Sequence, residues 1–118
     1  MPVKSIEKEG FAYIAYRREG TKDYMDFKAE VEAHVKKDGG SNDIVLDLTK
    51  SDSLTEDEMG VLAEVLGSFR GTKRALRLIL SKPIHDKLDS QNFFKANNLS
   101  AYDNHASFLE FLKKRNSG

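Results

Sequence analysis

Two apolar patterns alternate along this chain, and their alternation is the feature that most constrains its fold. Runs typical of β-strands occur at residues 3–6, 11–16, 43–48, 75–80 and 101–102. Segments with apolar residues three and four apart, typical of amphipathic helices, follow the later runs. Helices interleaved with strands favour parallel neighbours joined by right-handed crossovers. We therefore expect an α/β fold with a four- or five-stranded, mostly parallel sheet, about four helices and the order ββαβαβαβα.

The first half of the chain shows these signals most clearly. Glu7-Lys8-Glu9-Gly10 offers a turn with a glycine, so the first two runs are predicted to form a hairpin. A helix should follow until Gly39-Gly40, with its apolar side formed by Tyr24, Phe27, Val31 and Val35. The β-branched run from Asp43 to Leu48 is typical of a strand that is buried on both faces of a parallel sheet.

The second half predicts three more helices. One carries apolar residues at helical spacing from Met59 to Phe69, and the next is expected to begin at Ser81 as a cap and to become irregular before a turn at Asn97-Asn98. Asp103 or Asn104 should cap the last helix. The side chains expected on the buried side of that helix are Phe108, Leu109, Phe111 and Leu112.

Size and charge bound the class of protein. The 118 residues are the usual size of one domain, which we place at residues 1–114, with a polar tail at 115–118. Nineteen Lys and Arg balance nineteen Asp and Glu, so no chain-wide field favours nucleic acid. The apolar runs are too short to span a bilayer, and the first residues lack the apolar core of a secretory signal. We expect a cytoplasmic protein with no membrane insertion.

The residues offer little for catalysis or for a cofactor. The chain has no cysteine, and its three histidines lack the spacing of metal ligands. Glycine-rich phosphate loops and a nucleophile elbow are missing from the sequence. A basic stretch, Arg70, Lys73, Arg74 and Arg77, is predicted to be a solvated turn. We therefore expect no metal, no cofactor and no enzymatic activity.

The most unusual segment is the acidic one that follows the strand 43–48. Thr55-Glu56-Asp57-Glu58 fits the capping box, in which the Thr55 hydroxyl accepts from the Glu58 amide and the Glu58 carboxylate accepts from the Thr55 amide. Thr55 is therefore the predicted N-cap of a helix. Carboxylates in the first turn also gain from the helix dipole, so helix stability by itself could account for these acids.

In order of elements and in local sequence, the chain resembles the STAS domains of anti-sigma factor antagonists. Ile44 to Leu48 is similar to a family strand "IVLDL", and the segment from Leu54 to Leu62 resembles its "DSSGLGVL". Residues 75–80 look like the next family strand, and Ala101 to Asn104 are similar to its "VYDS". The resemblance implies a bacterial regulatory protein that binds an anti-sigma factor of the ATP-binding kinase type, or a related complex.

The chain departs from the family at the position that its relatives phosphorylate, which we call the switch position. In register, Glu56 stands where the family has the serine that its partner kinase phosphorylates, Asp57 at a second serine and Glu58 at a glycine. Carboxylates imitate the charge of a phosphate but not its shape, so the resemblance implies a fixed phospho-mimic or a repurposed surface. The residues expected to contact a protein partner are Asp52, Ser53, Thr55, Glu56, Asp57, Glu58 and Met59.

Several alternatives stay open at this level. Thr55, Ser51 or Ser53 could be phosphorylated in place of the missing serine, although the neighbouring acids disfavour another negative charge. Small STAS domains also serve as subunits of membrane transporter complexes or bind small nucleotides or lipids, and the resemblance extends to both roles. A homodimer is possible as well, because the acidic loop and the basic stretch have opposite charge.

Overall fold

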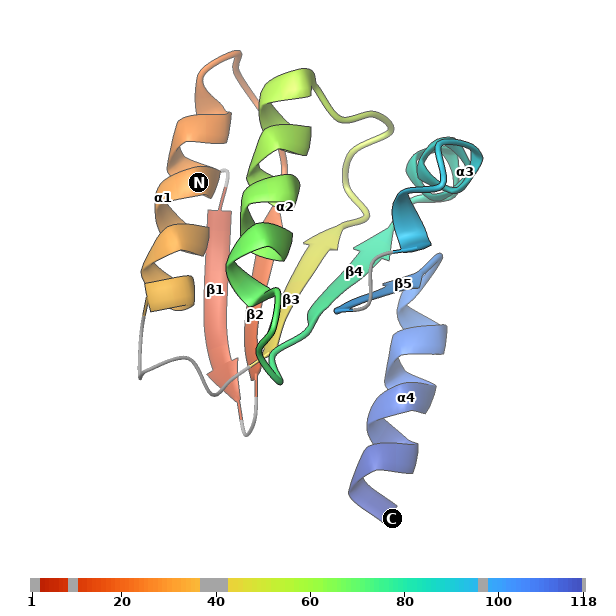
Figure 1. The fold of residues 1–118 in the computed structure, drawn as a ribbon. Helices are drawn as coiled ribbons and strands as arrows, with labels where there is room; N and C mark the ends of the chain where they lie inside the picture. Colours follow the sequence, from red (N-terminus) through yellow and green to blue (C-terminus); the bar gives the residue numbers. More distant parts are fainter. Residues whose placement is uncertain (1–2, 9–10, 37–42, 96–97, 118) are drawn as a thin grey trace.

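A computed structural model describes residues 3–8, 11–36, 43–95 and 98–117, and its element order confirms the predicted ββαβαβαβα pattern (Figure 1). The elements are β1 (Val3–Lys8), β2 (Phe11–Tyr16), α1 (Asp23–Lys36), β3 (Asp43–Leu48), α2 (Glu56–Phe69), β4 (Leu76–Leu80), α3 (Lys82–Ser90), the short 3-10 helix η2 (Phe93–Lys95), β5 (Leu99–Tyr102) and α4 (His105–Ser117). The turn expected at Glu9-Gly10 and the break expected at Gly39-Gly40 lie outside the described residues.

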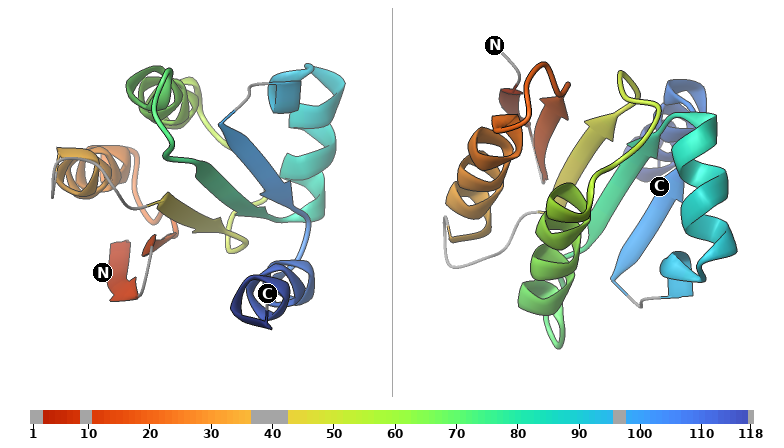
Figure 2. Two further views of the ribbon diagram at one scale, coloured as in Figure 1. Left: turned by 60° about the horizontal axis from the view of Figure 1, so that its bottom comes forward. Right: turned by 90° about the horizontal axis from the view of Figure 1, so that it is seen from above.

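The five strands form one sheet in the order β1-β2-β3-β4-β5. β1 pairs antiparallel with β2, as the hairpin prediction requires, and the other neighbours are parallel. Each parallel crossover joins adjacent strands in the same direction, so crossovers of one hand place α1, α2 and α3 on the same face. Figure 2 shows these three helices on one side of the sheet and α4 on the other.

The alternation of side chains along β3 divides the core in two. Ile44, Leu46 and Leu48 belong to the larger apolar cluster, which is covered by the three crossover helices. Val45 belongs to the smaller cluster on the α4 face, together with Phe108. Burial of β3 on both faces explains its continuous apolar run, as the sequence predicted.

Ser81 occupies the N-cap position of α3 but does not cap the helix with its side chain. Its hydroxyl instead donates to the backbone carbonyl of Ser51 at 2.7 Å, in the loop between β3 and α2. The prediction of a side-chain cap was therefore wrong, because a tertiary partner competes for the hydroxyl. The expected irregularity after α3 is confirmed, since Asn92 has a positive φ of 59° and η2 follows it.

Asn104 is the residue that caps α4, and its side-chain oxygen accepts from the amide of Ser107 at 2.8 Å. Phe108 is buried, but Leu109 is 53% exposed, so the prediction that Leu109 lies on the buried side was wrong. Leu109 is rotated about 100° around the helix from Phe108, and in α4 this rotation takes it off the face that packs on the sheet. α4 runs to Ser117, so the predicted domain boundary at residue 114 falls inside this helix.

The basic stretch is not uniformly solvated, which corrects the sequence prediction. Arg70 and Lys73 are exposed, whereas Arg74 is only 6% exposed. Arg77 on β4 pairs with Asp43 at 3.3 Å and lies over the ring of Phe111. Two of the four cations therefore belong to the packing of the fold rather than to a basic surface.

Candidate functional site

The acidic segment lies where β3 leaves the sheet, and its loop is fixed at its base. The amide of Ser51 donates to the Leu48 carbonyl at 3.2 Å, and the Ser51 carbonyl accepts from Ser81. Ser51 is buried, with 8% of its surface exposed. These contacts fix the position of the loop before it continues to the start of α2. They also leave Ser53, rather than Ser51, as the exposed serine of the loop.

The predicted capping box is present at the start of α2. The amide of Glu58 donates to the Thr55 hydroxyl oxygen at 3.1 Å, and the Thr55 amide donates to the Glu58 carboxylate at 2.8 Å. Two amides that the helix itself cannot satisfy are paired in this way. The first turn of α2 therefore has a defined backbone position.

Glu58 has a second set of partners that the sequence did not predict. Its carboxylate accepts from the hydroxyl of Tyr16 on β2 and from the guanidinium of Arg18, each at 2.5 Å. The residue is 0% exposed. The expectation that Glu58 offers a polar contact to a partner is therefore corrected: its side chain points into the domain and joins helix to sheet.

The tyrosine in this network is held in its neutral form. Burial, followed by the hydrogen bond and charge of Glu58, raises the pKa of Tyr16 well above its usual value. Tyr16 also stacks on Phe27 of α1, with ring centroids 4.3 Å apart. Glu58 thus accepts a hydrogen bond from a neutral hydroxyl whose ring is fixed by packing, which makes this contact structural.

The other predicted site residues lie at the surface. Asp52, Ser53, Thr55, Glu56 and Asp57 are exposed, and Met59 is partly buried against the core. The acidic surface of the helix start therefore consists of Glu56 and Asp57, with Asp52 further back in the loop. Of the four acids in the segment, three are therefore exposed and Glu58 is buried.

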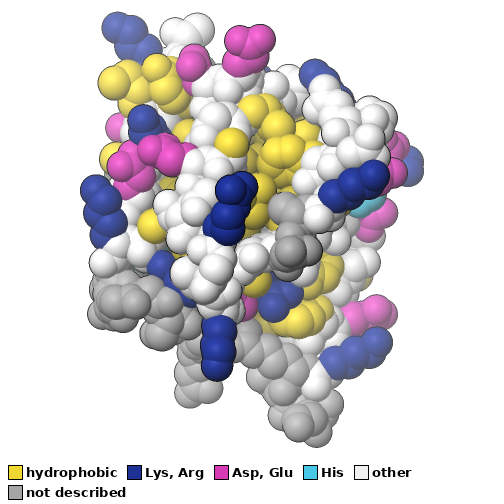
Figure 3. All heavy atoms as spheres, viewed as in Figure 1, with side chains coloured by type: hydrophobic (Ala, Val, Ile, Leu, Met, Phe, Trp, Pro, Cys, Tyr) yellow, Lys and Arg dark blue, Asp and Glu magenta, His cyan; other side chains and the backbone are white. Residues whose placement is uncertain are grey.

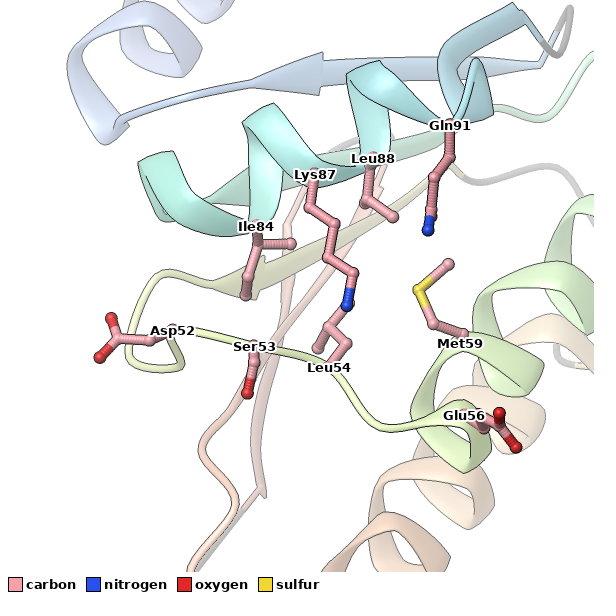
Figure 4. A pocket seen from close by; sticks show the side chains of 9 residues that line it. All are labelled: Asp52, Ser53, Leu54, Glu56, Met59, Ile84, Lys87, Leu88 and Gln91. Atoms are coloured by element: carbon pink, nitrogen blue, oxygen red, sulfur yellow. The ribbon is translucent and has the colours of Figure 1, made fainter.

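A pocket of about 340 Å³ opens between this loop, the start of α2 and α3 (Figure 4). Its lining residues are Asp52, Ser53, Leu54, Glu56, Met59, Ile84, Lys87, Leu88 and Gln91. In Figure 4 Lys87 extends from α3 toward Leu54, and Gln91 points toward Met59. The carboxylates of Asp52 and Glu56 point away from the pocket. Figure 3 shows apolar side chains in the hollow between α2 and α3.

The part of this pocket that α3 contributes was not predicted from the sequence. Ile84 and Leu88 are four residues apart and therefore share one face of the helix, which was a usable signal. Which surface that face meets depends on how the crossover after β4 packs. Nothing in the local sequence specifies that contact.

A second polar cluster lies on the opposite face of the sheet. Asp47 of β3 accepts from the Tyr13 hydroxyl and from the backbone and side chain of Thr49, and its carboxylate is 2.7 Å from His105 Nε2. Burial by itself would raise the pKa of Asp47, but the hydrogen bonds from His105, Tyr13 and Thr49 outweigh it and lower that pKa. The sequence signal for this cluster is an aspartate inside an otherwise apolar strand.

This second cluster borders an apolar pocket of about 310 Å³ beside α4. Its lining residues are Ile6, Phe11, Tyr13, His105, Phe108 and Leu109.

Within the described ranges, no three His, Asp or Glu side chains are grouped so that they could hold a metal ion. None of the helices among the described residues has the length and apolar character needed to cross a membrane.

A comparison with solved structures identifies the fold family that this chain resembles. The structure of RsbS from Moorella thermoacetica, in a form with one serine replaced by glutamate, matches this chain with a TM-score of 0.68. The match covers 100% of both chains at 18% sequence identity. No protein-family model and no curated protein matches the sequence. At this identity the likeness shows the fold, and the fold is STAS-like, as the sequence resemblance predicted.

Proposed function

We propose that this domain is a regulatory protein-binding module of the anti-sigma antagonist type, with a permanently acidic surface at its switch position. The observation that supports it best is the exposure of Glu56 and Asp57 on the first turn of α2, beside a Glu58 that is fully buried. The capping box and the contacts of Glu58 fix that turn, so the two exposed charges have a defined place.

The partner class that the resemblance implies is an anti-sigma factor of the ATP-binding kinase type, or a related regulatory complex. Two carboxylates at a helix start supply a negative charge comparable to that of a phosphoserine, without its tetrahedral geometry. RsbS, which has the same fold, was solved with a glutamate in place of a serine. By resemblance, phosphorylation in this family releases the partner, so a fixed acid would keep affinity for a kinase-type partner low.

The test replaces Glu56 and Asp57 with serine, the residue that the family has at these two positions. The double variant Glu56→Ser, Asp57→Ser should bind kinase-type anti-sigma factors of its host at least about tenfold more tightly than the natural chain, measured by titration calorimetry. Glu64→Ser is the matched control, because it removes an exposed acid from the same helix away from its start. Equal affinities for all three proteins would place the contact surface elsewhere.

A second candidate function, the sensing of a small ligand, is favoured by the pocket between α2 and α3. Its volume of about 340 Å³ is at the lower end of the range for small-molecule sites. A ligand that binds only the native state raises the melting temperature. A thermal-shift screen with guanine and adenine nucleotides would support this role if one of them stabilised the natural chain but not Leu88→Ala.

A further inference from the structure

We infer that the pocket beside α4 binds a small apolar amine, with the ammonium group next to His105 and Tyr13 and the hydrocarbon part against Ile6 and Leu109. The pocket lies on the face of the sheet opposite α2 (Figure 2), so this inference is independent of the proposed function. It depends on an apolar lining that ends at a cluster built around the carboxylate of Asp47.

The apolar lining comes from two strands and from α4. Ile6 of β1 pairs with Tyr13 of β2, and Phe11 lies two residues before Tyr13, so these three side chains share the face of the sheet that carries α4. Phe108 of α4 packs edge-on against Phe11, with ring centroids 6.2 Å apart. Ile6 and Leu109 are both more than half exposed. A hydrocarbon chain lying against them would therefore remove apolar surface from water.

The polar end of the pocket offers hydrogen-bond acceptors. His105 and Tyr13 line the pocket, and both contact Asp47, which is buried and whose hydrogen bonds lower its pKa. Because an ionised carboxylate can only accept, the Tyr13 hydroxyl and His105 Nε2 both donate to it. The Tyr13 oxygen and Nδ1 of a neutral His105 are then left as acceptors. A ligand group in contact with them has to donate.

Charge favours an ammonium group over a hydroxyl at this end. When His105 is neutral, the cluster carries the single negative charge of Asp47, and the described residues that line the pocket include no Lys or Arg. In the described part of the chain, Asp47 has no ion-pair partner besides His105. An ammonium group is both a donor and a cation, whereas a hydroxyl is only a donor and a carboxylate is neither. The pocket volume of about 310 Å³ is at the lower end of the range for small-molecule sites, which favours a small ligand.

The experiment titrates the isotope-labelled full chain by NMR with three probes that share one hydrocarbon chain: hexylamine, hexanol and hexanoate. The titrations are made at about pH 8, where an imidazole in water is neutral. Hexylamine should bind at least about fivefold more tightly than hexanol, and hexanoate should bind more weakly than both. The amide shifts should centre on the strands and the helix start that carry Phe11, Tyr13 and His105. No binding of hexylamine, equal or tighter binding of another probe, or shifts centred elsewhere would overturn the inference.

Two variants test the site and its charge separately. Leu109→Lys adds a cation to the lining and should weaken hexylamine binding at least about tenfold. Met25→Lys is the matched control, since Met25 is an equally exposed apolar residue on α1 that does not line the pocket. Asp47→Asn should reduce the affinity for hexylamine to that for hexanol, and thermal melting verifies that each variant folds. Equal effects of Leu109→Lys and Met25→Lys, or a preference for hexylamine that persists in Asp47→Asn, would contradict the assignment.

The exposed acids of α2 also attract a cation, so a further variant separates the two surfaces. Glu56→Ser, Asp57→Ser should bind hexylamine as tightly as the natural chain does, because both acids lie outside the pocket beside α4. Loss of binding in this variant would place the amine at the start of α2 and overturn the inference. The test of the proposed function measures a protein partner, so either proposal can fail while the other holds.

Discussion

The hydroxyl of Tyr16 on β2 donates to the carboxylate of Glu58 on α2 at 2.5 Å, and both side chains are buried. The same carboxylate closes the capping box with Thr55 and accepts from Arg18. One acidic residue therefore fixes both the start of α2 and the position of that helix over the sheet. The neighbouring Glu56 and Asp57 are exposed and take no part in these contacts.

Replacing Glu58 should destabilise the domain far more than replacing an exposed acid of α2. Glu58→Ala leaves the buried Tyr16 hydroxyl without an acceptor and should lower the free energy of unfolding by about 2–3 kcal/mol. Glu58→Gln keeps an acceptor and should lose about 1 kcal/mol. Urea unfolding measures both, with Glu64→Ala as the control expected within about 0.5 kcal/mol of the natural chain. Equal losses for Glu58→Ala and Glu64→Ala would show that the network contributes nothing.

Asp47 should make the domain sensitive to acid. Its pKa is lowered in the folded state, so it contributes stability above its usual value of 3.8, and this contribution is lost as the pH falls through the lower, folded-state value. Asp47→Asn should therefore flatten the fall in unfolding free energy between about pH 5 and about pH 2. Asp52→Asn, which removes an exposed carboxylate, controls for the change in net charge. A slope in Asp47→Asn as steep as that of the natural chain would contradict the assignment.

Arg74 should stabilise the end of α1 from a distance in the sequence. Its guanidinium donates to the carbonyls of Val35 at 2.7 Å and His34 at 3.2 Å, and it lies 4.4 Å from the ring centre of Phe69. Arg74→Ala should lower the free energy of unfolding by about 1–3 kcal/mol, because helix-end carbonyls lose a charged donor. Thermal or urea unfolding checks this, and Lys73→Ala, at an exposed neighbour, should have little effect. Hydrogen exchange should rise in α1 rather than in α4.

Gly67 should be a site where stability can be gained. It lies in the helix α2, and an added Cβ would meet nothing within 4 Å. Gly67→Ala should raise the free energy of unfolding by about 0.5–1 kcal/mol, because alanine loses less backbone entropy on folding. Gly71 offers the contrast: its φ is 77°, so Gly71→Ala should be destabilising. Calorimetric melting of the two variants gives the comparison, and a shift of the same sign in both would contradict it.

Local patterns predicted most of the fold. The period of apolar residues identified the strand Asp43–Leu48 and the helix Glu56–Phe69, and the Thr55 to Glu58 spacing predicted the capping box. Each of these depends on residues a few positions apart, so the sequence carries the whole interaction. The resemblance through residues 44–62 predicted the STAS-like fold, which the structural match confirms.

Three of the errors concern polar side chains whose partners are distant in the sequence. Ser81 matched a cap by position, but the Ser51 carbonyl takes its hydroxyl. Arg74 was expected at the surface as part of a solvated basic turn, and Glu58 as part of the partner-binding start of α2. Their partners, the Val35 carbonyl and the Tyr16 hydroxyl, belong to elements far away along the chain. Periodicity identifies the face of a helix but not what lies opposite it.

The sequence by itself determined the order of strands and helices, the capped start of α2 and the accumulation of acids there, because periodicity and capping act over a few neighbouring residues. Only the tertiary structure decided which acid is buried and which are exposed, and that α3 closes a pocket beside them. Those outcomes depend on contacts between residues such as Tyr16 and Glu58, whose distance along the chain has no local signature.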